Sequence, residues 1–250
     1  MSELKTEYFD NGNRKSEQYY KDGKLHGKCT YWHENGEIER IVDFKNDKKE
    51  GKYLQWYEDG TPFMEVDHVN DKIHGKFIQR YPNGEKELEI SYKDDKYHGK
   101  FSYYHDNGTK YQDEYWKDDT LTGKTTEWHY NGQKASDGNC IYGLKEGKFT
   151  YWYINGQKAE EGNYKGGDRV GKWTEWHVNG NKKGEGYYEG FFLKEGPWVQ
   201  WNESGEIRAK GSYMNGEKEG DWVYWYANGL KKTKAYYRNG VLFSGQELLK

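Results

Sequence analysis

Apolar residues, cysteines and prolines are all scarce in this chain of 250 residues. Only 33% of the residues are hydrophobic, 32% are charged, and there are two cysteines and three prolines. No apolar run approaches the roughly 20 residues that a membrane-spanning helix needs. Such a composition is by itself typical of disorder. The 11 tryptophans and 25 tyrosines favour instead a thin folded structure whose core consists of aromatic rings.

Two further absences limit the classes of function. The formal net charge is −3 with acids and bases interspersed, so no basic footprint for nucleic acid is visible. The first five residues lack the apolar segment of a signal peptide. We therefore expect a cytoplasmic protein, or an exported one whose leader has been removed.

The two cysteines lie far apart in the sequence, at Cys29 and Cys140. If successive strands are neighbours in space, these residues are nine strands apart, which is about 43 Å at ~4.8 Å per strand. A disulfide requires about 5.5 Å between Cα atoms. We therefore predict free thiols in a reducing compartment.

A short turn sequence recurs every 24 residues along the whole chain. Asn-Gly occupies positions 11–12, 35–36, 83–84, 107–108, 131–132, 155–156, 179–180 and 228–229, and Asp59-Gly60 and Ser204-Gly205 fill the two gaps. One extra residue lies between Gly180 and Gly205. A second glycine, such as Gly147, precedes the glycine of every turn but the first by nine residues. This period predicts an array of one small unit.

The segment 147–171 shows what one unit builds. An aromatic and β-branched stretch leads to Asn155-Gly156, which predicts a hairpin with a two-residue turn and positive φ at both positions. A second strand runs through Tyr164, and a longer turn rich in Gly and Asp leads to the next unit. No room remains for a helix of ordinary length.

We therefore predict an all-β fold, an elongated single-sheet antiparallel meander of about ten 24-residue β-hairpin repeats. It forms one domain over 1–250, with an incomplete N-terminal unit at 1–26 and a C-terminal cap at 242–250. Residues 246–250 leave the repeat pattern, and we expect a short helix there.

Alternation along the strands predicts which side chains are buried. The fifth residue after the repeat glycine is aromatic in nearly every unit, for example Trp152, and Arg80 is the exception. The sixth residue after the turn is small or β-branched, for example Gly162. If both share a face, the indoles form a buried ladder across the glycines. Trp152 is then predicted to be largely buried, and Tyr153 to lie on the opposite face.

That opposite face is predicted to be polar and aromatic, and suited to a protein partner. The turn after Tyr188 differs from the others, because it holds the extra residue and three consecutive apolar residues ending at Leu193. This turn either contacts a partner or covers the sheet edge. The candidate partner-binding residues are Tyr103, His105, His129, Tyr151, Tyr153, His177, Phe191 and Phe192.

The repeat resembles a known family. Gly147-Lys148, Trp152-Tyr153, Asn155-Gly156 and Gly162-Asn163-Tyr164 are similar to the MORN repeat variant, including a YwqK-like bacterial group described as antitoxins. The resemblance extends from about Tyr8 to Gly245. It implies a binding or scaffolding module, sometimes in contact with lipid, and it carries over no catalytic residue. Pro197 and Asp221 depart from the pattern, since lysine usually follows the repeat glycine.

Catalytic and metal chemistry find little support in the sequence. Equivalent histidines such as His105 and His129 are two strands apart, about 9.6 Å, whereas each ligand of a zinc ion lies ~2 Å from the metal. No catalytic triad or phosphate-binding loop is evident, and we expect no cofactor. We predict a non-enzymatic repeat scaffold that binds another protein, with an antitoxin or immunity-like role as one version. The alternative is a module that binds membrane lipid or cell-surface glycan, and an enzyme comes third.

Overall fold

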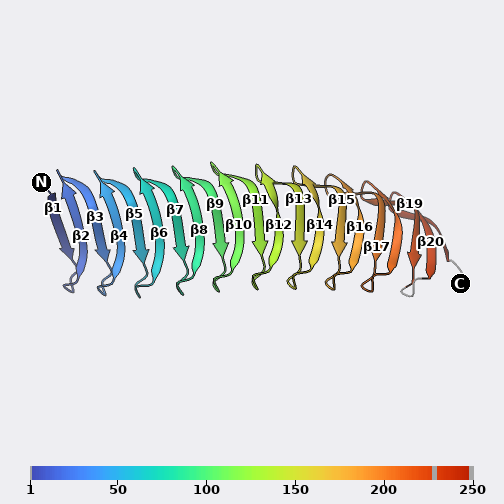
Figure 1. The fold of residues 1–250 in the computed structure, drawn as a ribbon, viewed down its shortest axis with the longest axis horizontal. Coiled ribbons are helices and arrows are strands. Elements are labelled where there is room, and N and C mark those ends of the chain that lie inside the picture. Colours follow the sequence, from blue (N-terminus) through green and yellow to red (C-terminus); the bar gives the residue numbers. More distant parts are fainter. Residues whose placement is uncertain (1, 227–229, 248–250) are drawn as a thin grey trace. The chain divides into compact units, whose positions relative to one another are not determined.

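The structure, a computed structural model, describes residues 2–226 and 230–247, with side chains as far as Gly245. Every secondary-structure element in these residues is a β-strand, and every pairing is antiparallel (Figure 1). The chain divides into two compact units, Met1–Thr122 and Gly123–Lys250. The predictions of an all-β fold and of antiparallel pairing are confirmed.

The first unit is a meander in which each strand pairs with the next one in the sequence. Its strands are β1 (Ser2–Tyr8), β2 (Arg14–Lys21), β3 (Lys24–Trp32), β4 (Ile38–Lys45), β5 (Lys48–Trp56), β6 (Pro62–Val69), β7 (Lys72–Arg80), β8 (Lys86–Lys93), β9 (Lys96–Tyr104) and β10 (Lys110–Lys117).

The second unit continues in the same way, and its boundary falls inside β11. Its strands are β11 (Thr120–Trp128), β12 (Lys134–Ile141), β13 (Leu144–Trp152), β14 (Lys158–Lys165), β15 (Asp168–Trp176), β16 (Lys182–Glu189), β17 (Lys194–Trp201), β18 (Ile207–Met214), β19 (Glu217–Trp225), β20 (Lys231–Arg238) and β21 (Val241–Glu247).

The C-terminal segment adds a strand to the second unit. β21 pairs with β20 from Val241 to Glu247, so the expectation of a helix is wrong for Gln246 and Glu247. The predicted cap residues 248–250 lie outside the described part of the chain. The physical reason is local: Asn239 and Gly240, with φ of 47° and 75°, form a turn, and an apolar stretch follows that suits a strand.

The Asn-Gly loops are one residue longer than predicted. In the loop of the 147–171 unit, the Tyr153 carbonyl accepts a hydrogen bond from Gly156 N (2.8 Å), and Tyr153 N donates to the Gln157 carbonyl (2.8 Å). Gly156 has φ of 82°, whereas Asn155 keeps a negative φ. This is a three-residue loop that ends in a left-handed glycine. The asparagine side chain supports it, because Gln157 N donates to Asn155 Oδ1 (3.1 Å).

The two-residue turns lie at the opposite ends of the strands. At the turn between β4 and β5, Asn46 and Asp47 both have positive φ, at 51° and 68°. The same holds for Tyr142 and Gly143 between β12 and β13. The turn predicted to be the longer one is therefore the tighter one. Asn, Asp and Gly tolerate the left-handed conformation that such hairpins need.

The buried aromatic ladder lies at a different repeat position from the predicted one. Phe149 pairs directly with Gly162, and directly paired residues share a face, so Gly162 shares its face with Phe149 and not with Trp152. In the next unit the equivalent aromatic residue, Trp173, is fully buried and lies across Gly162. Trp152 is only half-buried. The prediction that Trp152 belongs to the core is therefore wrong.

The core of the second unit consists of rings that meet edge to face. Trp173 contacts Tyr164 and Tyr188 at interplanar angles of 87° and 79°, and Trp198 contacts Tyr188 and Tyr213 at 88° and 82°. This geometry is the preferred one for aromatic pairs. In the first unit the buried core residues include Cys29, at the repeat position of Trp173, and Val42, Val66 and Ile90, at the repeat position of Gly162. Both cysteine thiols are reduced, as predicted.

Candidate interaction surfaces

The two faces of the sheet differ in chemistry. The core face carries the buried ladder of Phe149 and Trp173. The opposite one, here the lysine face, carries Lys148, Thr150, Trp152, Lys158 and Glu161 in the 147–171 unit, and the equivalent residues in other units. Among the described residues no helix or second sheet covers either face.

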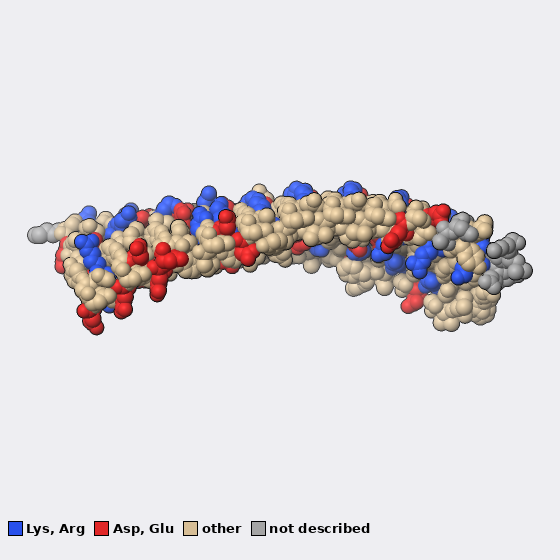
Figure 2. All heavy atoms as spheres, turned by 90° about the horizontal axis from the view of Figure 1, so that it is seen from below, with Lys and Arg blue, Asp and Glu red and all other residues tan. Residues whose placement is uncertain are grey.

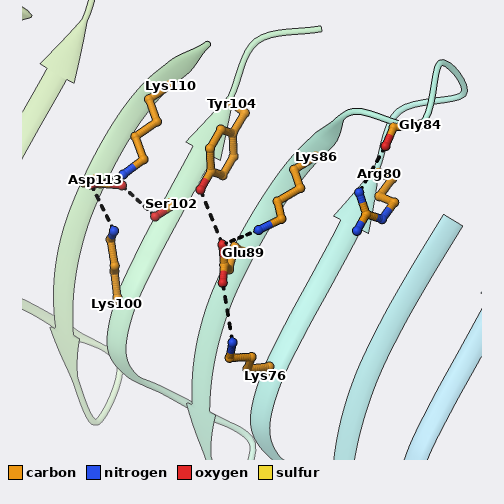
Figure 3. Close-up of polar contacts among 10 residues, drawn as sticks. All are labelled: Lys76, Arg80, Gly84, Lys86, Glu89, Lys100, Ser102, Tyr104, Lys110 and Asp113. Atoms are coloured by element: carbon orange, nitrogen blue, oxygen red, sulfur yellow. Dashed lines mark hydrogen bonds and ion pairs between the residues drawn. The ribbon is translucent and has the colours of Figure 1, made fainter. Parts of the chain in front are cut away.

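Lysine pairs on the lysine face converge on shared carboxylates. Glu89 lies between Lys86 Nζ, 2.9 Å from Oε2, and Lys76 Nζ, 3.9 Å from Oε1 (Figure 3). Tyr104 OH donates a hydrogen bond to the same carboxylate (3.4 Å). The hydrogen bond from Lys86 contributes most to lowering the pKa of Glu89. The same arrangement recurs at Asp113, Asp137, Glu161 and Glu185.

The half-buried indoles of the lysine face serve as platforms for these lysines. Lys134 Nζ lies 5.8 Å from the ring centroid of Trp152, and Lys158 Nζ lies 5.6 Å from that of Trp176. Such contacts contribute modestly at exposed sites. Arg80, the exception at this position, instead donates a hydrogen bond from Nη1 to the carbonyl of Gly84 (3.1 Å) and so braces its own loop (Figure 3).

Three of the predicted partner-binding residues link one Asn-Gly loop to the next. Tyr153 OH donates to the carbonyl of Trp176 (2.7 Å). His129 Nε2 and His177 Nε2 lie 2.9 and 3.1 Å from the corresponding carbonyls of Trp152 and Trp201. The loop asparagines add a parallel row of bonds to the following loop, such as Asn155 Nδ2 to Val178 O (2.8 Å) and Asn131 Nδ2 to Ile154 O (2.8 Å).

Replacing Tyr153 by phenylalanine tests these bonds between successive Asn-Gly loops, here called the loop ladder. The ring stays and only the hydroxyl is lost, so the Trp176 carbonyl loses its side-chain donor. We expect the free energy of unfolding to fall by about 0.5–1.5 kcal/mol. Denaturant titration measures the change. Tyr142→Phe, at a residue that is 83% exposed, is the matched control and should leave stability unchanged; equal effects would contradict the ladder.

The remaining tyrosines and histidine of the predicted site contact neighbours within the chain. Tyr151 lies on the core face, where its hydroxyl is 3.0 Å from that of Tyr164 and accepts a hydrogen bond from Lys145 Nζ (2.7 Å). Burial raises the pKa of Tyr151. The rings of Tyr103 and His105 both meet the ring of Tyr111, at 5.5 and 5.3 Å. The predicted partner-binding tyrosines and histidines are thus divided between the core face and the loops, and partner binding by them stays a prediction.

The longer turn between β16 and β17 presents two strained aromatic residues. Phe191 and Phe192 have φ of 41° and 60°, a conformation that bulky side chains rarely adopt. Phe191 is 81% exposed, and the Phe192 ring centroid lies 5.9 Å from Cζ of Arg169. The third apolar residue of the turn, Leu193, lies against Gly216 of the following turn. Leu193 therefore packs on the neighbouring turn and Phe191 is exposed, and partner contact by this turn stays a prediction.

Sequence reasoning missed an apolar row at the Asn-Gly loops of the second unit. Tyr130, Ile154 and Val178 occupy the position before the asparagine in three consecutive loops, and they are 56%, 60% and 56% exposed. In the first unit this position holds Asp10, Glu34, Glu58, Pro82 and Asp106. Figure 2, which looks onto this edge, shows carboxylates gathered at the N-terminal end. The signal was present in the sequence as a change of residue type at one repeat position.

Metal and membrane sites find no support in the part of the chain that is described. Within residues 2–226 and 230–247, His, Cys, Asp and Glu side chains nowhere gather in groups of three that could hold a metal ion. The same residues contain no helix with the length and apolarity that crossing a membrane requires.

The repeat pattern and the hairpin geometry together point to a known repeat. Five segments match the MORN repeat variant. They cover residues 4–22, 25–46, 73–94, 145–165 and 194–215. The chain thus contains repeats that match the MORN repeat variant, and the loops of its hairpins are bonded to one another.

Other comparisons add little on function. No curated protein matches the chain. Solved structures with detectable likeness include crystal structures titled TcdB2-TccC3 and TcdB2-TccC3-Cdc42, at 9% and 10% identity and TM-scores of 0.22 and 0.20. They are matched over 97% and 93% of this chain, which spans only 15% and 14% of theirs.

Proposed function

We propose that this MORN-type chain is a non-enzymatic scaffold that binds another protein, mainly through its second unit. The observation that carries this proposal is the apolar row of Tyr130, Ile154 and Val178. Exposed apolar side chains repeated over consecutive units are unusual on a surface without a partner. The strained, exposed turn at Phe191 and Phe192 lies in the same unit and supports a second contact.

The chemistry of the surfaces supports binding rather than catalysis. Carboxylates on the lysine face are held by lysine pairs, and the loop histidines His129 and His177 lie against backbone carbonyls. The buried, reduced thiols fit a cytoplasmic location. An antitoxin or immunity-like role is the finer form of this proposal, because a scaffold can block a partner by covering it and needs no cofactor.

Replacing Ile154 and Val178 by serine tests the contact surface. We expect the affinity for a partner recovered by pull-down from the native cell to fall at least about ten-fold, because a few apolar anchors carry most interface energy. Calorimetry with the purified partner measures the loss. Phe191→Ser with Phe192→Ser should weaken binding separately, with additive effects if the sites are distant.

The matched control is Glu34→Ser with Glu58→Ser, at the same loop position in the first unit. It should bind like the parent. Unchanged affinity in both sets of second-unit variants, with folding verified by circular dichroism, would contradict the proposed surface. Binding to lipid vesicles or glycans in the absence of any protein partner would instead support the alternative class of binding module.

A further inference from the structure

A hollow of about 310 Å³ opens on the core face of the second unit, between β15 and β18. Gly184 lies at its base, where the absence of a Cβ leaves space beside Glu175 and Trp198. Lys183, Lys194 and Arg208 line it as well. The hollow therefore combines an indole wall with three cations and one carboxylate.

The cations of this hollow differ from those of the lysine face in having no carboxylate partner. Among the described residues, no ion pair involves Lys183, Lys194 or Arg208, whereas lysines such as Lys172 and Lys182 share a carboxylate. The ammonium of Lys194 lies 4.0 Å from the ring centroid of Trp198, and burial lowers its pKa. Three cations against one carboxylate leave an excess of positive charge that the chain itself does not neutralise.

A second hollow of about 390 Å³ continues the same surface. Arg208 lines both hollows, and the second also includes Lys232, Tyr224, Trp225 and Tyr237. We call Lys183, Lys194, Arg208 and Lys232 together the cation track. Figure 2 shows basic side chains on the underside of this C-terminal part.

Three residues of the cation track repeat with the period of the fold. Each cation comes directly before a residue that pairs across the Asn-Gly loop, and the partner is at the same repeat position in every unit. The three pairs, after Lys183, Arg208 and Lys232 respectively, are Gly184 with Glu175, Ala209 with Gln200, and Thr233 with Tyr224. Equivalent positions in adjacent units are two strands apart, about 9.6 Å. A polyproline II segment rises about 3.1 Å per residue with three residues per turn, so every third side chain recurs on one side at about 9.3 Å.

We propose that the cation track binds an acidic segment of a partner protein in the polyproline II conformation, with Asp or Glu at every third residue. The proposal rests on the proposed scaffold function and identifies the chemistry of its partner. Aromatic walls such as Trp198 and Tyr224 suit this conformation, because extended polyproline II segments dock in aromatic-lined grooves. Since the whole chain carries a net charge of −3, the attraction is local to the track.

Binding of synthetic peptides to the full chain tests the proposal. The probe is a labelled peptide of four Glu-Pro-Pro triplets, measured by fluorescence anisotropy at low and physiological salt. Lys-Pro-Pro triplets and a peptide with Glu at every second residue are the controls. We expect binding of the first peptide only, weakening as salt rises. The triple variant Lys183→Gln, Arg208→Gln, Lys232→Gln should bind about ten-fold or more weakly, because three exposed charge pairs are lost.

A matched triple variant controls for net charge. Lys21→Gln, Lys117→Gln, Lys165→Gln removes the same three charges from exposed strand ends and should bind like the parent. Equal weakening in both triples would show a nonspecific charge effect and overturn the proposal. Equal or tighter binding of a short thymidine oligonucleotide would also overturn it, in favour of a nucleic-acid site.

The outcome is separable from that of the proposed function. A recovered partner that binds the parent and the Lys183, Arg208, Lys232 triple variant equally would leave the scaffold function standing and overturn the cation track. Failure to recover any protein partner, together with specific binding of the Glu-Pro-Pro peptide, would contradict the scaffold proposal and support the cation track.

Discussion

Replacing Trp173 by alanine should lower the free energy of unfolding by about 3–5 kcal/mol, the range for large aromatic residues in cores. Trp173 is fully buried, its rings meet Tyr164 and Tyr188 edge to face, and its Nε1 donates to the carbonyl of Asn163 (3.2 Å). Truncation removes all of these contacts and uncovers Gly162. Denaturant titration followed by near-ultraviolet circular dichroism measures the loss.

Trp152→Ala is the control for this prediction, because it removes the same side chain from the lysine face. Trp152 is half-buried, and the ammonium of Lys134 lies 5.8 Å from its ring centroid. The loss of stability should be clearly smaller. If the two variants were equally destabilised, the division of the tryptophans into a core set and a platform set would fail.

The sequence predicted the repeat and the strand pairing well, and it predicted the faces poorly. The 24-residue period and the Asn-Gly turns are local signals, and each is sufficient to place a hairpin. Which residues share a face depends on the pairing across the loop, as in Phe149 opposite Gly162. A bulge between Tyr151 and Trp152 shifts the register further. Neither the loop length nor the bulge has a strong signal in a single sequence.

The candidate surfaces were predictable in part, for a different reason. Tyr153 and His129 were identified as repeating polar aromatic residues, which is correct, but their acceptors are backbone carbonyls of the next unit. A carbonyl acceptor has no sequence signature, so the role in the loop ladder could not be inferred. The apolar row was accessible, because the change from Glu34 and Glu58 to Ile154 and Val178 is visible at one repeat position.

The two units use their repeats differently. In the first unit Val42, Val66 and Ile90 occupy the repeat position of Gly162, and the position before the turn asparagine is mostly acidic. In the second unit glycines take that position and lie under large rings such as Trp173, while the loops and the core face carry the exposed apolar and unpaired basic groups. A large flat ring that lies across a glycine covers the neighbouring strand, so no second layer of helices or strands is needed there. The Asn-Gly loops of the second unit therefore stay exposed.

Gly162→Ala should destabilise the parent chain by about 1–3 kcal/mol, the usual cost of overpacking. A Cβ at this position would lie 2.1 Å from Cδ2 of Trp173, and the indole is held by its bond to Asn163. The backbone itself tolerates alanine, since Gly162 does not have a positive φ.

The sign of this effect should reverse when Trp173 is absent. In a Trp173→Ala background the clash disappears, and alanine should then stabilise the strand by about 0.5–1 kcal/mol relative to glycine, through the lower entropy of its unfolded state. A double-mutant cycle by denaturant titration isolates the coupling between the two positions. Additive effects of Gly162→Ala and Trp173→Ala would mean that the indole does not rest on this glycine, and the physical reason given for the glycines of the second unit would be wrong.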